Sequence, residues 1–124
     1  MSKKIVLPAR PGALFSRAVQ GGGLVFLSGH VAGTPEQVDP NDIRSQTRGT
    51  FQNIARTLGE AGLNLGDVVR VTVYLTNIDD KPGMDEIYRE FFITDTPARS
   101  TVAINSLAGN EFLIEVDIVA VAKA

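Results

Sequence analysis

Hydrophobic and polar residues alternate over short segments near the start of the chain, a pattern typical of β-strands with one buried face. Residues 15–20 alternate in this way, and the apolar segment 24–27 follows them after Gly21-Gly22-Gly23. Because glycine tolerates positive φ, the three glycines predict the turn of a β-hairpin. A phosphate-binding loop is the disfavoured alternative, since neither a helix nor a Lys-Ser/Thr pair follows the glycines.

Two segments show the spacing of three and four residues that indicates amphipathic helices. The first is predicted to begin at residues 39–42, with Asp39 as the N-cap carboxylate, and to end at Gly62 as a left-handed C-cap. The second begins with Asp79-Asp80 and Pro82. The apolar face of the first helix consists of Ile43, Thr47, Phe51, Ile54, Leu58 and Ala61. The inward residues of the second are Met84, Ile87, Tyr88 and Phe91.

Three more strands are expected after the first helix. Residues 69–76 alternate, and segments 100–105 and 112–122 close the chain. The more apolar face of the first of these strands consists of Val69, Val71, Val73 and Leu75. The order ββαβαββ predicts one α+β domain over residues 1–124, a mixed β-sheet with two helices on one face.

The last strand is apolar on both of its faces. Phe112, Ile114, Val116 and Ile118 point one way, whereas Leu113, Val119 and Val121 point the other way beside Glu115 and Asp117. A strand with this pattern is usually buried on both faces. Two helices cover one face only, so we expect a second copy of the chain to cover the other in a homo-oligomer. The alternative is an ordinary exposed face with scattered apolar residues.

The composition narrows the possible chemistry. The 124 residues are 44% hydrophobic and 21% charged, with a net charge of −2. This balance disfavours a dedicated nucleic-acid or anionic-membrane binder. The lack of cysteine rules out a disulfide, a thiolate nucleophile and a Cys-ligated zinc site, and one histidine makes a multi-histidine metal site unexpected. From these counts we expect no bound metal. No secretory or membrane-spanning segment is evident, so we expect a cytoplasmic protein.

Arg99 and Glu115 are the strongest candidates for chemistry, because each places a charge in a strand expected to be buried. Arg99 lies where a turn enters a strand that the pattern makes central, so it requires an anionic partner from the protein or from a ligand. One interpretation is a structural ion pair of Arg99 and Glu115 with each other or with neighbours. The other is a small pocket where Arg99 binds a carboxylate and Glu115 holds or activates water.

The other polar candidates have simpler interpretations. His30 follows a strand, and no nucleophile motif accompanies it, so a hydrogen-bonded structural role is favoured over catalysis. The pairs Asp79-Asp80 and Asp85-Glu86 surround a helix N-terminus, where negative charge complements the helix dipole. We expect these acids to be solvated capping charges rather than metal ligands.

Six stretches, taken in their order and spacing, form a specific combination over nearly the whole chain. They are LVFLSG at 24–29, the helix at 46–62 ending in LGEAG, LGDVVRVTVYLTNIDD at 65–80, YREFF at 88–92, PARST at 97–101 and IEVDIVAVA at 114–122. In these stretches the chain resembles the reactive-intermediate deaminase family, also called the RidA or YjgF family. The resemblance implies a fold similar to chorismate mutase and a homotrimer with clefts between subunits.

The resemblance also implies an activity and its residues. Members hydrolyse enamines and imines derived from amino acids to 2-oxo acids and ammonia, without a cofactor. By this resemblance Arg99 binds the substrate carboxylate and Glu115 positions the hydrolytic water. Thr101 lies where backbone groups flank the ligand, and Ser28 and Gly29 line the cleft.

The chain differs from the family pattern at four places. Phe15 replaces a tyrosine whose hydroxyl reaches the cleft, and His30 replaces the usual glutamine after Ser-Gly. Both are expected to line the substrate site. Asp85 stands where asparagine is frequent and would oppose a carboxylate ligand if it lines the cleft, and the segment 81–83 is unusual for its helix start. These differences bear on substrate range rather than on the type of reaction.

Two other functions stay open at this stage. A trimer that binds a 2-oxo acid without turnover would use the same Arg99, and only the role of Glu115 distinguishes it from the enzyme. Ribonuclease activity is disfavoured, because the chain is acidic and lacks a basic, aromatic surface pattern.

Overall fold

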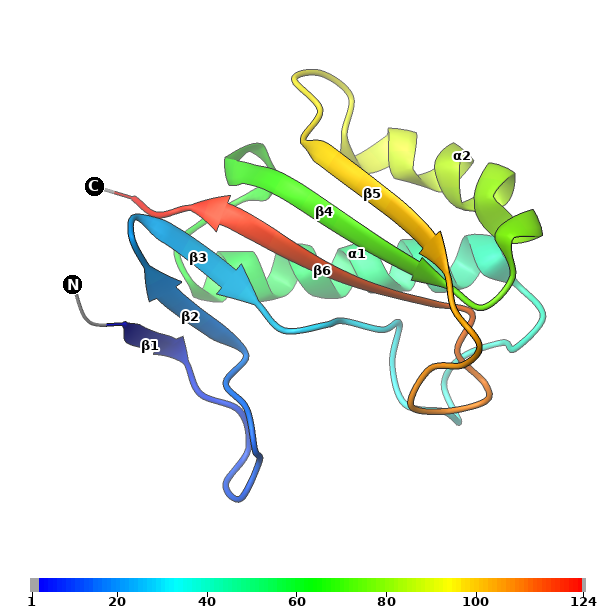
Figure 1. Ribbon diagram of the computed structural model, residues 1–124, viewed down its shortest axis with the longest axis horizontal. Coiled ribbons are helices and arrows are strands. Elements are labelled where there is room, and N and C mark those ends of the chain that lie inside the picture. Colours follow the sequence, from blue (N-terminus) through cyan, green and yellow to red (C-terminus); the bar gives the residue numbers. More distant parts are fainter. Residues whose placement is uncertain (1–2, 124) are drawn as a thin grey trace.

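A mixed six-stranded β-sheet forms one layer of the molecule in the computed structural model, which describes residues 3–123 (Figure 1). The strands are β1 (Lys4–Leu7), β2 (Ala18–Gly21), β3 (Leu24–Leu27), β4 (Val68–Leu75), β5 (Ala98–Ala103) and β6 (Ile114–Val121). Their order across the sheet is β1-β2-β3-β6-β4-β5. Only the β4–β5 pair is parallel.

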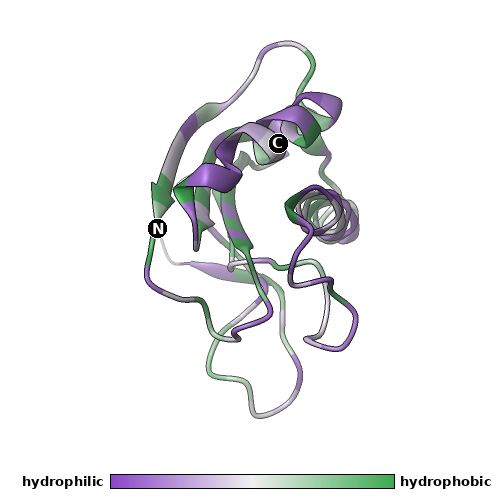
Figure 2. Cartoon of the chain, turned by 90° about the vertical axis from the view of Figure 1, so that its right-hand side faces the viewer, coloured by the Kyte–Doolittle hydropathy of each residue, from purple (hydrophilic) through white to green (hydrophobic). Residues whose placement is uncertain are grey.

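Two helices, α1 (Ile43–Glu60) and α2 (Lys81–Phe91), lie on the same face of the sheet (Figure 1). Figure 2 shows α1 nearly end-on, beside that face. The buried core between the layers includes Phe51, Ile54 and Leu58 of α1. The predicted α+β architecture with both helices on one face is therefore confirmed. No helix among residues 3–123 is long and apolar enough to cross a membrane.

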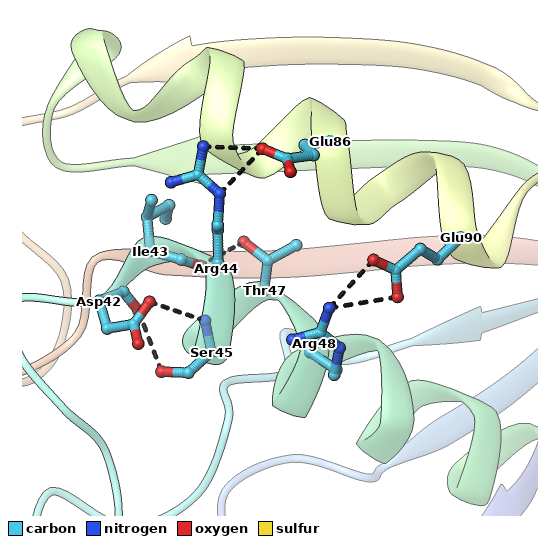
Figure 3. Close-up of polar contacts among 8 residues, drawn as sticks. All are labelled: Asp42, Ile43, Arg44, Ser45, Thr47, Arg48, Glu86 and Glu90. Atoms are coloured by element: carbon cyan, nitrogen blue, oxygen red, sulfur yellow. Dashed lines mark hydrogen bonds and ion pairs between the residues drawn. The ribbon is translucent and has the colours of Figure 1, made fainter.

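The ends of α1 follow from local sequence, with one correction at its start. The N-cap is Asp42 rather than Asp39, and its side chain accepts a hydrogen bond from the Ser45 amide at 3.0 Å (Figure 3). Asp39 instead accepts a hydrogen bond from the Asn41 amide, which makes a turn before the helix. At the other end Gly62 has φ +77°, as predicted for a left-handed cap.

Exposed ion pairs join the two helices. Arg44 contacts Glu86 at 2.7 Å and Arg48 contacts Glu90 at 3.0 Å (Figure 3). These pairs are about half exposed, so each contributes little to the free energy of unfolding. They do show that Glu86 is an inter-helix partner rather than the solvated capping charge expected from the sequence.

The N-terminal strands form the predicted hairpin and one more strand. Gly22 and Gly23 have φ of +60° and +79°, as a tight two-residue hairpin turn between β2 and β3 requires. The strand predicted from residue 15 begins only at Ala18. β1 was not predicted, because its four residues show no alternation and it pairs at the edge of the sheet.

Two expectations about the C-terminal half of the sheet were wrong. A β-bulge lies between Val68 and Arg70, so Val68 is buried and Val69 is 41% exposed rather than inward-facing. β5, which carries Arg99, is an edge strand and not a central one, because it pairs only with β4. The central position belongs to β6, which lies between β3 and β4.

The side chains of β6 alternate between the two faces of the sheet, as the sequence pattern predicted. The inward residues Ile114, Val116 and Ile118 are buried against the helices, at most 1% exposed. On the opposite face Val121 is 45% exposed, and Phe26 of β3, which pairs with Val119, is 47% exposed. Among the described residues nothing covers this outer face, so the oligomer stays a prediction.

Candidate functional site

Arg99 lies on the helix face of the edge strand β5. In the sheet it pairs with Val71, which is fully buried, and its side chain packs over α2. The guanidinium carbon lies 4.6 Å from the centre of the Tyr88 ring, a cation–π contact. A position next to an edge leaves the side chain 21% exposed, so it is reachable from solvent.

The structure supplies Arg99 with a protein anion, Asp85 of α2. Arg99 Nη1 lies 2.8 Å from Asp85 Oδ1, and the Asp85 side chain is also 21% exposed. Burial alone would raise the pKa of Asp85, but the hydrogen bond from Lys81, the ion-pair contact with Arg99 and the positive charges of both outweigh burial and lower it. Asp85 is therefore a structural counter-ion, and its expected role as a solvated capping charge was wrong.

Lys81 makes this ion pair a three-residue cluster. Its Nζ lies 2.8 Å from Asp85 Oδ2, one helical turn away on α2. Lys81 and Asp85 line an open cavity of about 580 Å³ beside the start of α2. The role of Lys81 was not predicted, although its spacing of four residues from Asp85 is a recognisable helix ion-pair signal.

Unused polar groups surround Arg99. Among residues 3–123, no acceptor other than Asp85 and the Met84 sulfur contacts the guanidinium. A guanidinium has five N–H donors, so donors remain for a ligand. Thr101, on the same face of β5, has a buried hydroxyl without a hydrogen-bond partner, and so does Tyr88. Thr101 thus lies near Arg99, and its place beside a ligand stays a prediction.

Glu115 lies on the opposite face of the sheet. It pairs across the sheet with Tyr74, whose side chain points away from the helices, whereas Arg99 pairs with the inward Val71. Two residues of neighbouring strands that pair in this way share a face. Arg99 and Glu115 of one chain therefore do not meet, and the structural ion pair between them is excluded.

An open groove of about 400 Å³ borders the Glu115 carboxylate. Its walls are Phe15, Ser28, Gly29 and Ala108. No residue in the described part of the chain forms a hydrogen bond or ion pair with this carboxylate. Burial, and next the charge of Asp117, raise the pKa of Glu115. An unpaired carboxylate with a raised pKa is suited to accept and return a proton.

Gly29 allows the close approach of Glu115. A Cβ at this position would overlap Glu115 Oε2. Ser28 supports the same wall, because its hydroxyl donates to the Ser16 carbonyl oxygen at 2.7 Å and ties the loop before β2 to the sheet. Phe15, on that loop, is 57% exposed at the groove. The structure thus brings Phe15, Ser28 and Gly29 together with Glu115.

His30 is held by the protein on both ring nitrogens. Nδ1 lies 2.7 Å from the Ser28 carbonyl oxygen, which only accepts, so Nδ1 carries the hydrogen. Nε2 then accepts from the Thr57 hydroxyl at 2.8 Å. Burial lowers the pKa of His30, the Ser28 hydrogen bond opposes this, and the charge of Arg17 adds to the lowering. The structural interpretation of His30 is supported, and its contact with a substrate stays a prediction.

The candidate residues therefore lie in two separate places on one chain. Arg99, with guanidinium donors to spare, lies at the edge of the sheet on the helix face. Glu115 lies unpaired in a groove on the opposite face, against the bare backbone of Gly29.

Comparison with known proteins identifies the family. The family model described as endoribonuclease L-PSP matches residues 8–122. A RutC family protein of Pyrococcus abyssi is 35% identical over 125 residues, which cover 97% of this chain and 98% of that protein. A protein of Dermatophagoides farinae named 2-iminobutanoate/2-iminopropanoate deaminase is 35% identical over 107 residues, covering 84% of this chain and 83% of its own.

A solved structure agrees with the family model and with these two relatives. YyfA of Yersinia pestis, described as a member of the conserved Rid protein family, is 30% identical with a TM-score of 0.85, and the match covers 98% of this chain and all of that one. The chain therefore belongs to the Rid family, also called the YjgF or endoribonuclease L-PSP family.

Proposed function

We propose that the protein hydrolyses small 2-imino acids, and the enamines in equilibrium with them, to 2-oxo acids and ammonia. For 2-iminobutanoate, the imine and one water give 2-oxobutanoate and one ammonia. The observation that carries the proposal is the unpaired Glu115 carboxylate in an open groove, with its pKa raised by burial. The similarity to a relative named 2-iminobutanoate/2-iminopropanoate deaminase supports the choice of substrate class.

The complete site requires two copies of the chain. Arg99 and Glu115 lie on opposite faces of one sheet, so they meet only if the β5 edge of one copy reaches the Glu115 groove of another. The exposed apolar outer face, with Phe26 and Val121, supplies a surface for such an assembly. We infer a homotrimer with one site in each cleft between subunits.

The proposed steps use protein groups alone. Arg99 binds the substrate carboxylate and orients the imine. Glu115 takes a proton from water as the water oxygen bonds to C2, and the C=N electron pair moves to nitrogen. Glu115 then gives that proton to the nitrogen, which makes a carbinolamine with an amino group. In the last step Glu115 carries the hydroxyl proton to the amino nitrogen, the C=O bond forms, and the C–N bond breaks to release ammonia. Because the imine carbon is already electrophilic, positioning supplies most of the acceleration.

The experiment generates 2-aminoacrylate from serine with a dehydratase and follows the release of pyruvate. We expect the native chain to accelerate release, and Arg99→Ala and Glu115→Gln to lose the acceleration. Glu90→Gln, which removes an exposed carboxylate on α2, is the matched control and keeps it. Binding of 2-oxobutanoate without acceleration would instead show a non-catalytic binding protein. RNA cleavage that survives in pure Arg99→Ala protein would show a separate ribonuclease activity.

A further inference from the structure

The cluster of Lys81, Asp85 and Arg99 holds two positive charges and one negative charge. Each oxygen of Asp85 has its own partner, with Oδ1 at 2.8 Å from Arg99 Nη1 and Oδ2 at 2.8 Å from Lys81 Nζ. The cluster is partly exposed, because Lys81 and Asp85 line the open cavity at the start of α2. Arg99 does not line this cavity, but its side chain is itself 21% exposed, so a ligand bound to Arg99 would lie beside the Asp85 carboxylate that Lys81 also contacts.

Asp85 by itself would oppose the binding of an acid. Arg99 and Asp85 alone make a neutral pair, and an incoming carboxylate would lie close to a second carboxylate. Lys81 changes the net charge of the cluster. It neutralises Asp85 at Oδ2, the oxygen that Arg99 does not contact, and so leaves the three residues with one net positive charge. The Asp85 side chain can then stay with Lys81 while Arg99 turns its N–H groups to a ligand.

We propose that Lys81 is a specificity-determining residue, which compensates Asp85 and so keeps Arg99 able to bind a substrate carboxylate. This inference rests on the proposed function, in which Arg99 is the acid-binding group. Lys81 is a positioning residue that acts through Asp85, and it makes no bond to the reacting atoms. The net charge of the cluster suits a substrate with one carboxylate.

The test is a double-mutant cycle on ligand affinity. The dissociation constant of 2-oxobutanoate is measured by titration calorimetry for the native chain, Lys81→Gln, Asp85→Asn and the double variant. We expect Lys81→Gln to weaken binding about fivefold when Asp85 is present, and by less than about twofold in the Asp85→Asn background, where no charge needs compensation. Lys81→Arg keeps the charge and should retain native affinity.

A matched control separates this effect from net charge. Arg48→Gln also removes one cation from a helix ion pair, but Arg48 contacts Glu90 rather than the cluster. It should leave the affinity unchanged. With the deaminase assay, Lys81→Gln should raise KM and leave kcat unaltered, whereas a loss of folded protein would lower the apparent kcat.

The outcomes distinguish this inference from the proposed function. An equal effect of Lys81→Gln in both backgrounds, or no effect in either, would overturn the role of Lys81 while 2-oxobutanoate binding and deaminase activity persist. If neither the native chain nor Asp85→Asn binds 2-oxobutanoate or accelerates pyruvate release, the proposed function itself fails, and the role of Lys81 fails with it.

Discussion

At the scale of single residues, the site depends on how closely groups approach rather than on unusual residue types. Glu115 reaches the groove wall because Gly29 has no side chain in its path. Arg99 is held in place because its guanidinium lies over the Tyr88 ring and pairs with Asp85. Small changes at these contacts should alter chemistry more than folding.

Replacing Gly29 with alanine tests the close approach. The new Cβ would displace the Glu115 carboxylate, whose flexible side chain can move at little cost in stability. We expect deaminase activity to fall at least about tenfold, because a misplaced proton-transfer group loses most of its effect, while the melting temperature changes little. Gly59→Ala is the control, since its Cβ meets open space on α1. Native activity in Gly29→Ala would contradict the proposed role of Glu115.

The pH dependence of activity tests the same carboxylate. Burial and the charge of Asp117 raise the pKa of Glu115, so it takes up its proton at a higher pH than an ordinary glutamate. The ionised form is the proposed base, and kcat/KM should therefore fall as the pH falls through this raised pKa. Asp117→Asn removes one of the two causes of the raised Glu115 pKa. In a pH–rate profile of this variant, the fall of kcat/KM should therefore shift to lower pH. An identical profile for the two proteins would argue against Glu115 as the titrating group.

At the scale of elements, caps and ion pairs position α1 and α2 over the sheet. α1 ends in a left-handed glycine, with the Leu63 amide donating to the Leu58 carbonyl oxygen at 2.8 Å and the Gly62 amide to the Gly59 carbonyl oxygen at 3.1 Å. This is the Schellman pattern. α2 is joined to the edge strand β5 through Asp85 and Arg99. The elements that carry the site are thus fixed by different kinds of contact.

Gly62→Ala tests the helix end. The position has φ +77° and open space around it, so the cost comes from backbone conformation alone. We expect the free energy of unfolding to fall by about 1 kcal/mol in urea denaturation. Gly59→Ala, within α1, should raise it by up to about 1 kcal/mol, because alanine favours a helix. A loss of equal size at both positions would contradict this account.

Asp85→Asn tests the junction of α2 and β5. The pKa of Asp85 is lowered in the folded chain, so its contribution is present above the pKa of the unfolded chain and is lost as the pH falls through the folded-state pKa. The variant should lose less than about 1 kcal/mol of stability at neutral pH, and the difference should shrink in acid. Glu86→Gln, in a more exposed pair, should show a smaller loss. Urea denaturation at both pH values measures this.

At the scale of the whole molecule, one chain provides only half of each proposed site. The sheet separates Arg99 from Glu115, and the outer face of the sheet keeps Phe26 and Val121 exposed. A second copy of the chain on the outer face would both cover these apolar residues and bring an Arg99 to the Glu115 groove, which would complete the site. Activity and assembly should therefore be lost together.

Sedimentation tests the assembly. We expect a mass near three times the 13.3 kDa of one chain. Phe26→Asp places a charge on the outer face and should give smaller species with no deaminase activity, because the cleft is lost. Ile93→Asp is the control, since Ile93 is 80% exposed in the loop after α2. A folded native monomer at micromolar concentration would contradict the shared site.

Part of this structure follows from local residue patterns alone. Helical spacing, strand alternation and the turn glycines predicted both helices and most strands, and PARST and the last strand led to Arg99 and Glu115. The pairing of the strands became known from the three-dimensional structure. It placed β5 at the edge, turned Val69 outward through a bulge and put Arg99 beside Asp85 rather than Glu115. These features arise from contacts between segments far apart in the chain, and a local residue pattern does not name the partner of a strand or of a side chain.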